Sequence, residues 1–524
     1  MDANMKKFDP LKILLAASEC APLAKSGGLG DVVAGLAKEL KNAGHDARIV
    51  LPLYRSINRE KYGITFKAPA CVHLGGLESW VGVFTCELDG LVPVWLVEHE
   101  DFFGRGGIYD ENNQEYGDNA YRYALFSKAC LQLCKDFDWI PDVIHVHDWS
   151  TAPITAYLKT WDRVLSPLSA TASVLTIHNI GYQGVYDASV LPYMGFGNEQ
   201  FQPDIFEDHG RANLLKAGVW YADALTTVSP THAEEILTSG GGMGLAPYLN
   251  RRASDVFGIL NGADYTQWDP RHDPLITTNY SADAMSGKAE CKRHLREQFA
   301  LTESKAPIIG LVSRLVEQKG TDLLRGMLTH ALEQMDFQLI LLGTGDTHIQ
   351  DYFSWLALRF SGKVGTVIGF SNELSHRIVA GSDFFLMPSL YEPCGLTQLY
   401  SMRYGTLPIV RETGGLKDTV KAYNRDDGSG TGFTFSEPTS QALQDTLGWA
   451  LDTWVNRPEH IHSMQQEAMA CDFSWDKSIP DYLRVYRQAI KNRRKLLHLE
   501  SPTPRHKLER NFMLEGITPD IIIE

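Results

Sequence analysis

The feature that most constrains the fold is an alternation of short apolar runs with amphipathic segments, which occurs twice along the chain. This alternation is typical of βαβ units, in which helices cover both faces of a parallel sheet. The first series predicts strands at Lys12–Ala17, Ala47–Leu51, Val143–Val146, Val174–Ile177 and Leu225–Val228. The second predicts strands at Ile308–Val312, Gln338–Leu342, Lys363–Ile368, Phe384–Met387 and Leu407–Val410. We therefore expect an α/β protein with two Rossmann-like doubly wound domains.

A turn-rich stretch, Asn261–Asp273, separates the two series. Its Asn-Gly and Asp-Pro pairs are turn signals, so we place the hinge between the domains close to residue 258. A length of 524 residues also exceeds the usual size of one hydrophobic core. Residues 76–98 look different from the other runs and predict antiparallel strands. In open α/β sheets ligands sit beyond the carboxyl ends of the strands, so the site is expected in a cleft between the domains.

Net charge narrows the classes of partner. The formal charge is −15 and the pI is near 5.6, which disfavours a surface for nucleic acid or anionic lipid. The sequence also lacks an uninterrupted apolar stretch of the roughly 20 residues that span a bilayer. A neutral polysaccharide needs no charge complementarity and remains compatible. We expect neither nucleic acid nor membrane as a partner, and the sequence does not specify an oligomeric state.

The number and spacing of the cysteines indicate the cellular compartment in which the protein is expected. The eight cysteines include no C-x-x-C pair and are too sparse for a disulfide framework, which favours a reducing cytoplasm. The segment Leu11–Ala21 superficially resembles a signal peptide, but Lys12, Glu19 and the preceding Asp9-Pro10 interrupt its apolar character. We interpret it as the first buried strand.

A glycine-rich loop, Lys25–Asp31, follows the first strand and opens a helix. Its glycines let a ligand approach the backbone, the helix N-terminus offers free amides, and Lys25 adds a positive charge. These properties favour binding of a diphosphate. A plain glycine-rich turn is the alternative, because short motifs produce false positives. The loop matches neither G-x-G-x-x-G nor the P-loop, which disfavours a dehydrogenase and a P-loop NTPase.

A second cationic loop, Ser313–Gly320, follows the first strand of the second domain. Arg314 lies at the strand end and Lys319 at the start of a helix, where two cations could converge on a departing pyrophosphate. The alternative is a pair of solvated surface residues, which is the commoner situation for Arg and Lys.

The string Pro388–Gln398 follows the strand Phe384–Met387. Proline and glycine fix a tight turn, the amides of Gly395–Thr397 can open toward an anion, and Glu392 can accept hydrogen bonds from sugar hydroxyls. A carboxylate that only caps its own loop would not explain the whole string.

Histidines end two strands of the first domain. His178 is followed by Asn179, and on its own a histidine at such a place is more often structural than catalytic. His145 and His147 share one face of a strand and could suggest a metal site. A zinc hydrolase would need further ligands, and no additional histidine cluster presents itself nearby in the sequence. Asp148 and the adjacent Trp149 suit a carbohydrate better.

Taken in order, these motifs resemble those of the bacterial glycogen synthases and plant starch synthases, from about residue 11 to 486. The motifs that carry the resemblance are Lys25–Asp31, His147–Trp149, Thr176–Asn179, Lys216–Gly218, Thr227–Pro230, Leu260–Gly262, Ser313–Gly320, Leu342–Asp346, Pro388–Thr397 and Thr413–Leu416. The resemblance implies the glycosyltransferase B-type fold, in which two Rossmann-like domains face each other across a cleft. It implies an acceptor-side domain over 1–258, a nucleotide-sugar domain over 259–472 and a helix over 473–495 that returns to the first domain. The tail, 496–524, has no counterpart in the family.

The resemblance also implies an activity and a set of site residues. It implies a retaining glucosyltransferase that transfers glucose from ADP-glucose to the non-reducing end of an α-1,4-glucan. The catalytic residues that it implies are His178, Arg314, Lys319, Glu392 and Asp148. The nucleotide-sugar residues that it implies are Lys25, Gly27, Gly28, Asp31, Tyr109, Asn179, Asn261, Phe370, Cys394, Gly395, Leu396 and Thr397.

Two aromatic positions refine this picture. In the family the aromatic at Phe370 stacks on the base, whereas Tyr109 is matched to a nucleotide aromatic although segment 102–110 departs from the usual pattern. Many B-type retaining transferases have a second glutamate eight residues after the first, usually for the ribose. Here that position is Tyr400, so ribose recognition must come from elsewhere.

The residue types favour charge stabilisation over a protein nucleophile. A retaining glycosidase would place two carboxylates about 5 Å apart around the bond, whereas the conspicuous residues here are cations and helix N-termini. Arg314, Lys319 and Lys25 could meet the diphosphate's charge, so we expect no metal cofactor. Three alternatives stay open: a B-type transferase that uses UDP-glucose or a small-sugar acceptor, a silent glucan-binding protein, and a metal-dependent hydrolase built on His145 and His147.

Overall fold

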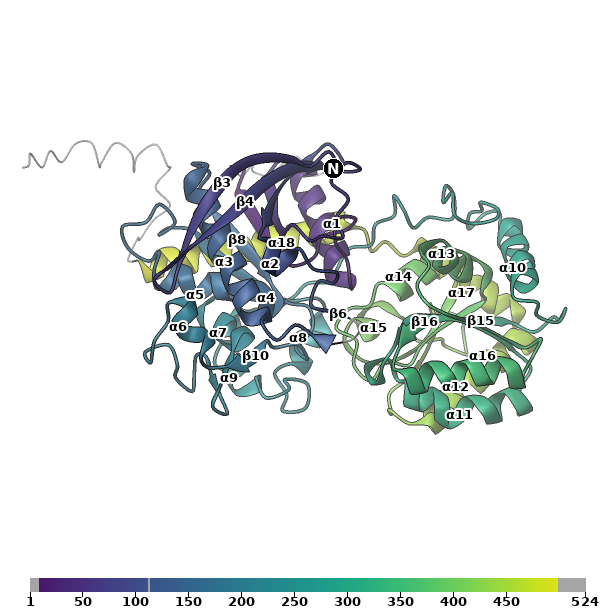
Figure 1. Cartoon of the computed structure of the whole chain (residues 1–524). Coiled ribbons are helices and arrows are strands. Elements are labelled where there is room, and N and C mark those ends of the chain that lie inside the picture. The colour runs from purple at the N-terminus through teal and green to yellow at the C-terminus, as the bar shows by residue number, and fades with distance from the viewer. Residues whose placement is uncertain (1–8, 112–113, 498–524) are drawn as a thin grey trace, which may run out of the picture.

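The computed structural model describes residues 9–111 and 114–497, which form two α/β lobes side by side (Figure 1). Each lobe contains its own sheet, mostly parallel in the first lobe and wholly parallel in the second, and its own buried apolar clusters. The predicted fold class, two Rossmann-like domains, is therefore confirmed. Apart from residues 496 and 497, the predicted tail lies outside the described residues.

The N-terminal lobe is built on a nine-stranded sheet. The strands, in spatial order, are β14 (Val256–Gly258), β13 (Ala224–Thr227), β9 (Ala172–Ile177), β8 (Val143–His147), β1 (Lys12–Ala16), β2 (Asp46–Pro52), β5 (Val92–Glu98), β4 (Leu77–Leu88) and β3 (Thr65–Leu74). Pairing is parallel from β14 to β5 and antiparallel in β5–β4–β3. The antiparallel strands expected within 76–98 are confirmed as β4 and β5. Strand β3 was not predicted.

Helices surround this sheet, and two small sheets extend the lobe. The helices are α1 (Gly28–Asn42), α2 (Glu100–Phe103), α3 (Asn119–Asp136), α4 (Asp148–Thr151), α5 (Pro153–Lys159), α6 (Val190–Met194), α7 (Leu214–Tyr221), α8 (Pro230–Glu235), α9 (Ala246–Asn250) and the 3₁₀ turn η1 (Ala253–Asp255). The small sheets are β10 (Val185–Asp187), β12 (Arg211–Asn213) and β11 (Glu207–Asp208), and β6 (Asp110–Glu111) with β7 (Gln114–Glu115).

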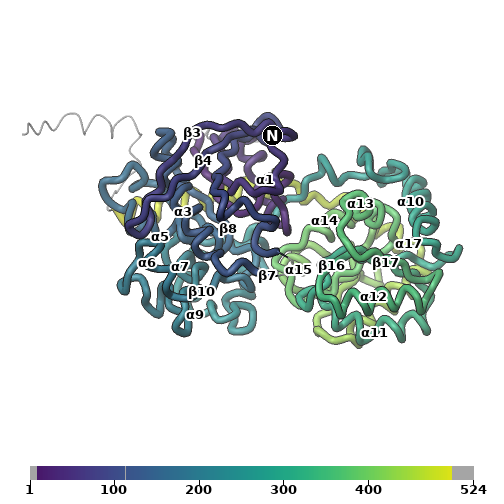
Figure 2. Tube along the Cα trace, in the orientation of Figure 1, coloured from purple at the N-terminus to yellow at the C-terminus, as the bar shows by residue number. Residues whose placement is uncertain are grey.

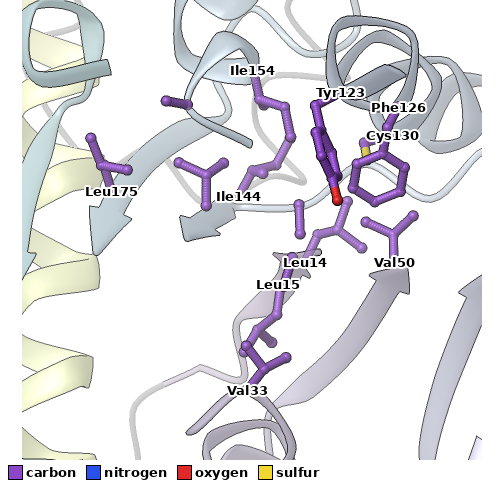
Figure 3. Packing of buried hydrophobic residues seen from close by; sticks show 14 of the residues in the cluster. Leu14, Leu15, Val33, Val50, Tyr123, Phe126, Cys130, Ile144, Ile154 and Leu175 are labelled. Carbon is purple, nitrogen blue, oxygen red and sulfur yellow. The ribbon is translucent and has the colours of Figure 1, made fainter. Parts of the chain in front are cut away.

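The strands at the centre of the N-terminal sheet differ from those at its antiparallel edge in how far their residues are buried. Strands β8 and β9 are buried at every residue because helices cover both faces, so even their polar residues, among them His145, His147 and Thr176, lie in the interior. Strands β3 and β4 expose many of their residues, so their apolar character is interrupted. Figure 3 shows the packing at the centre, where residues of the central strands meet those of α1, α3 and α5: Leu14, Leu15, Val50, Ile144, Leu175, Val33, Tyr123, Phe126 and Ile154.

The C-terminal lobe contains a six-stranded sheet that is parallel throughout. Its strands, in spatial order, are β17 (Val364–Ile368), β16 (Gln338–Gly345), β15 (Ile308–Leu315), β18 (Phe384–Met387), β19 (Leu407–Arg411) and β20 (Phe433–Phe435). Its helices are α10 (Ser286–Gln298), η2 (Glu317–Lys319), α11 (Thr321–Gln334), α12 (Thr347–Arg359), α13 (Asn372–Gly381), α14 (Thr397–Arg403), α15 (Gly414–Thr419), α16 (Ser440–Asn456) and α17 (Pro458–Ala470). All five strands expected here from sequence are present.

The chain crosses between the lobes twice. Ile259 packs in the N-terminal core and Ala263 in the C-terminal core, so the first crossing lies between them. The second precedes helix α18 (Trp475–Leu496), which lies along the N-terminal lobe although it is last in sequence (Figure 2). Trp475 fills the junction: a Cβ atom added at Gly262 would lie 2.4 Å from its ring. The two crossings are therefore packed against each other.

Helix α18 is fixed by polar contacts as well as by packing. The Tyr486 hydroxyl lies 2.9 Å from His145 Nδ1. The guanidinium of Arg493 is fully buried and donates to the carbonyls of Ser169 and Leu158, both at 2.8 Å. These bonds connect the last helix to β8, to α5 and to the loop that precedes β9.

Replacing Arg493 by Met should lower the free energy of unfolding by about 2–4 kcal/mol, because two buried carbonyls lose a charged donor. Denaturant unfolding monitored by circular dichroism would measure the loss. The matched control is Lys495→Met, since Lys495 is exposed on the same helix. Equal stability of both variants would contradict this role of Arg493.

Candidate active site

A cavity of about 920 Å³ lies between the two lobes, beyond the carboxyl ends of strands from both sheets. Each residue that the sequence analysis assigned to the site lines this cavity. From the N-terminal lobe and the hinge these are Lys25, Gly27, Gly28, Asp31, Tyr109, Asp148, His178, Asn179 and Asn261. From the C-terminal lobe they are Arg314, Lys319, Phe370, Glu392, Cys394, Gly395, Leu396 and Thr397. Motifs up to about 370 residues apart in the sequence therefore meet in one space.

The lobes touch across this cavity. A Cβ atom added at Gly28 would lie 3.8 Å from Leu396 Cδ1, so the glycine loop faces the Pro388–Gln398 string directly. Arg314 of the C-terminal lobe lies 3.4 Å from the hydroxyl of Tyr182 in the N-terminal lobe. The two cationic loops consequently belong to one site.

The glycine loop carries an ion pair between its own ends. Lys25 Nζ lies 2.7 Å from an Asp31 carboxylate oxygen, at the first turn of α1. Burial raises the pKa of Asp31, and the charge and hydrogen bond of Lys25 oppose that rise. Lys25 is thus held at the cavity wall by a carboxylate before any ligand is present.

Glu19, which the sequence analysis did not assign to the site, holds the start of this loop. Its Oε2 accepts hydrogen bonds from the amides of Ser26 (2.6 Å) and Gly27 (2.9 Å), and its Oε1 accepts one from Tyr109 Oη (2.8 Å). The Gly27 amide is therefore occupied, and a ligand would meet the amides further along the loop. The available signal was a carboxylate just after the first strand, which we had interpreted only as an interruption of an apolar run.

Tyr109 lies in the N-terminal wall. Its hydroxyl contacts Glu19 and Ser18, and its ring centroid lies 6.2 Å from that of Trp149. Phe370 lies across the cavity in the C-terminal lobe and is 82% exposed. The two aromatics therefore come from opposite lobes, and Phe370 is the one that presents an open face. Their predicted contacts with a nucleotide stay predictions.

The C-terminal cations differ in their partners. Lys319 Nζ and Ser389 Oγ both donate to Glu392 Oε2, at 2.5 and 2.9 Å, and Glu392 is 6% exposed. Within the part of the chain that the structure describes, the hydrogen bonds of the Arg314 side chain are two long ones, to Tyr182 and to Gln318, each 3.4 Å. Among residues 9–111 and 114–497 no carboxylate oxygen lies within 4 Å of the Arg314 guanidinium. Arg314 is therefore the predicted diphosphate cation whose charge is least compensated.

Asp148 accepts hydrogen bonds from the backbone just beyond the end of β9. Its Oδ1 accepts hydrogen bonds from the backbone amides of His178 (2.7 Å) and Asn179 (3.4 Å). Burial raises the pKa of Asp148 to about 7, although these two amides oppose the rise. Asp148 thus contacts the backbone of the two residues that follow β9, in addition to lining the cavity.

His178 is an uncharged group in this site. Its Nε2 lies 2.9 Å from His147 Nδ1, and burial lowers the pKa of His178 to about 3. At neutral pH it can exchange hydrogen bonds with a sugar hydroxyl but carries no positive charge. It therefore does not add to the positive charges of Lys25, Arg314 and Lys319 at the cavity wall.

The Pro388–Gln398 string wraps the cavity as a sharp turn. Gly395 has φ of +72°, and a Cβ atom there would lie 2.4 Å from Gln398 Oε1, so the turn requires glycine. Helix α14 begins at Thr397, immediately after it. Burial raises the pKa of the Cys394 thiol to about 12, so it stays protonated. The turn directs the start of α14 toward the cavity.

Two buried polar atoms at the cavity lack partners among the described residues. They are Asn261 Oδ1 at the hinge and Thr321 Oγ1 at the start of α11. Unpaired buried polar atoms are rare, and at a cavity wall these two can accept hydrogen bonds from, or donate them to, whatever fills the cavity. Thr321 is not among the predicted residues, because it directly follows the predicted loop Ser313–Gly320.

Tyr400, where the resemblance leads us to expect a glutamate, forms part of a ring stack. Its ring lies 4.4 Å from that of Trp268, which in turn lies 3.6 Å from the ring of His376. Trp268 and Tyr400 both line the cavity. This part of the cavity wall is therefore aromatic.

His145 is occupied within the N-terminal core. Its ring nitrogens contact Tyr486 Oη (2.9 Å) and Thr176 Oγ1 (2.6 Å), and it is fully buried. Within the described part of the chain, no group of three or more His, Cys, Asp or Glu residues is arranged to hold a metal ion. A hydrolase site built on His145 and His147 therefore lacks its ligands.

The two Rossmann-like lobes and the cleft between them match the fold of the B-type glycosyltransferases. The family model described as "Starch synthase catalytic domain" matches residues 12–251, and "Glycosyl transferases group 1" matches residues 294–469. Glycogen synthase 1 of Geobacter metallireducens is 43% identical over 93% of this chain and 97% of its own length. The chain belongs to the glycogen synthase family.

Solved structures agree with this assignment. The catalytic domain of starch synthase IV from Arabidopsis thaliana, bound to ADP and acarbose, is 35% identical, with a TM-score of 0.86, and covers 92% of this chain and 100% of that one. Sucrose-phosphate synthase from Thermosynechococcus elongatus has a TM-score of 0.56 at 18% identity, over 91% of this chain and 98% of that one, and shares the fold alone.

Replacing Asp148 by Asn should change how stability depends on pH. The raised pKa means that the folded state binds a proton that the unfolded state has released, so the wild type loses stability as pH rises from about 4 to 7. The variant lacks this loss. Melting curves should show a gap in favour of the variant that grows over this range to roughly a few degrees and is constant above pH 8. Parallel curves would refute the raised pKa.

Proposed function

We propose that the protein transfers glucose from ADP-glucose to the non-reducing end of an α-1,4-glucan with retention of the α configuration. The observation that carries this proposal is the single cavity in which Lys25, Arg314 and Lys319 meet beside Glu392. Membership of the glycogen synthase family supports the reaction, and the relative solved with ADP and acarbose supports the nature of donor and acceptor.

The diphosphate of the donor would lie where the two cationic loops face each other. Arg314 supplies an uncompensated charge, whereas Lys25 and Lys319 are already paired with carboxylates. A diphosphate would share or replace these carboxylates as partners of the lysines. Preorganised cations of this kind stabilise charge that develops on a leaving group.

Glucose would lie between Glu392 and the end of β9. Glu392 is held in place by Lys319 and Ser389, so its carboxylate can accept hydrogen bonds from sugar hydroxyls without changing its position. Neutral His178 and Asn179 face it from the other lobe. Hydroxyl recognition is thus divided between the lobes.

In the reaction itself, the 4-hydroxyl of the glucan end attacks the anomeric carbon on the face from which the diphosphate leaves. The bond from this carbon to the diphosphate oxygen breaks, the new bond to the 4-oxygen forms, and the hydroxyl proton passes to the leaving diphosphate. The retained configuration then requires no glycosyl-enzyme intermediate. The cations promote the step by stabilising the departing charge.

We also propose that no metal cofactor takes part and that the protein acts in the cytoplasm. The cation set supplies the charge that a divalent ion would otherwise contribute. All eight cysteines are free thiols, as suits a reducing compartment. In the described part of the chain, no helix has the length and apolar character needed to cross a bilayer.

Replacing Arg314 by Ala should lower kcat by about 100-fold or more, because the transition state loses its least compensated cation. Lys319→Ala should lower kcat by a similar factor and also free Glu392. Arg325→Ala is the matched control, since Arg325 is exposed on the neighbouring helix α11. Steady-state kinetics with melting temperatures would separate this loss from unfolding. Near-normal turnover in both variants would refute their role.

One assay tests the reaction as a whole. With glycogen as acceptor and EDTA present, we expect release of ADP from ADP-glucose and slower release of UDP from UDP-glucose. Fructose and glucose 6-phosphate should not replace glycogen. Binding of glycogen without nucleotide release would favour a silent glucan-binding protein. A small-sugar product would favour another B-type transferase, and loss of activity in EDTA would contradict the metal-free mechanism.

A further inference from the structure

Helices α8 and α15 face each other where the lobes meet (Figure 1). Two carboxylates connect them: each helix contributes one, and each carboxylate accepts hydrogen bonds from the start of the other helix. Asp418 on α15 accepts hydrogen bonds from the Thr231 amide (2.9 Å) and hydroxyl (2.7 Å) at the start of α8. Glu235 at the end of α8 accepts hydrogen bonds from the Gly414 amide and the Thr413 hydroxyl, both 3.0 Å, at the start of α15. Each helix thus caps the other, and we name this arrangement the reciprocal cap.

On the C-terminal side the reciprocal cap is attached to the Glu392 loop. The Gly415 amide donates to the Glu392 carbonyl at 3.1 Å. Gly414 has φ of +42°, and a Cβ atom there would lie 2.1 Å from that same carbonyl, so α15 packs directly on the loop. Any displacement of α15 relative to the other lobe therefore displaces Glu392.

On the N-terminal side the reciprocal cap is attached to β9, the strand that directly precedes His178. Ser229, which precedes α8, donates to the Pro393 carbonyl at 2.6 Å across the lobes. Two residues earlier, the Thr227 hydroxyl donates to the Ile177 carbonyl at 2.8 Å. The path from His178 to Glu392 is therefore continuous through β13, α8 and the reciprocal cap.

Glu235, the carboxylate that the N-terminal lobe contributes to the reciprocal cap, is ionised at neutral pH. Burial tends to raise the pKa of Glu235, but hydrogen bonds from His232, Gly414 and Thr413 outweigh that effect and lower it below its ordinary value. Glu235 is therefore ionised at neutral pH, and hydrogen bonds to an ionised acceptor are stronger than neutral ones.

We propose that Glu235 and Asp418 are positioning residues that hold the two lobes closed and so set the spacing between His178 and Glu392. Neither residue lines the cavity, so both act through the elements they connect. The kinetic part of this inference rests on the proposed function, whereas the effect on lobe closure does not.

The test uses the full chain with Glu235→Ala, Asp418→Ala and the double variant. Small-angle X-ray scattering without ligand should give a larger radius of gyration for the double variant than for the wild type. With ADP-glucose and glycogen, kcat/KM should fall at least tenfold in the double variant, because only a fraction of molecules is closed. Glu235→Gln keeps an acceptor oxygen and should recover most of the activity lost in Glu235→Ala. The matched control is Glu234→Ala, an exposed carboxylate on the same helix.

The outcomes separate this inference from the proposed function. A scattering curve shared by the wild type and the double variant, whether compact or expanded, overturns the inference. So does a kcat/KM within twofold of the wild type. If the wild type itself transfers no glucose, the proposed function fails while the scattering comparison still decides the role of the cap. Equal melting temperatures show that the variants are folded, and Glu235→Gln replaces any variant that is not.

Discussion

A diphosphate leaving group concentrates more negative charge than one loop can balance, and this constraint organises the whole proposed mechanism. Lys25 comes from the first lobe, whereas Arg314 and Lys319 come from the second, and all three line one cavity. Unit charges about 4 Å apart interact several times more strongly in a partly buried site than in bulk water. The site therefore gains from lying between lobes that exclude water when they are closed.

The carboxylates of the site show how such a cluster of cations is kept stable without ligand. Lys25 pairs with Asp31 and Lys319 pairs with Glu392, so two of the three charges are already balanced. Glu19 adds a buried negative group that holds the start of the glycine loop. Of the three cations, Arg314 is the one that has no carboxylate partner among the described residues, so it is the one most available to an anion. Neutral His178 fits the same scheme, since another positive charge in that place would have to be desolvated.

Much of this arrangement could be predicted from the sequence because its signals are local. Buried parallel strands read as continuous apolar runs, and the motifs that follow them must meet at the carboxyl edges of the sheets. The strands expected in both lobes and the lining of the cavity by the motif residues follow from these two rules. The edge strand β3 was missed because its exposed face interrupts the apolar pattern.

What the sequence could not give was the partner of each side chain. The pairing of Lys319 with Glu392 joins residues 73 positions apart, and the contact of Glu19 with Tyr109 spans 90. Such contacts depend on loop geometry, for which residue type carries little information. The reciprocal cap is similar, because the partners of Glu235 lie 178 and 179 positions away in the sequence. Local sequence patterns therefore predict where the site lies. The hydrogen-bond and ion-pair partners of its side chains depend on contacts between residues far apart in the sequence, and local patterns do not predict these.

The most direct test of the central claim is calorimetric binding of ADP and of adenosine to the wild type, Lys25→Ala and Arg314→Ala. If cations of both lobes close on one diphosphate, each variant should bind ADP at least tenfold more weakly, while adenosine affinity stays unchanged. Wild-type affinity for ADP in either variant would contradict the claim, because the diphosphate would then be held by one lobe alone.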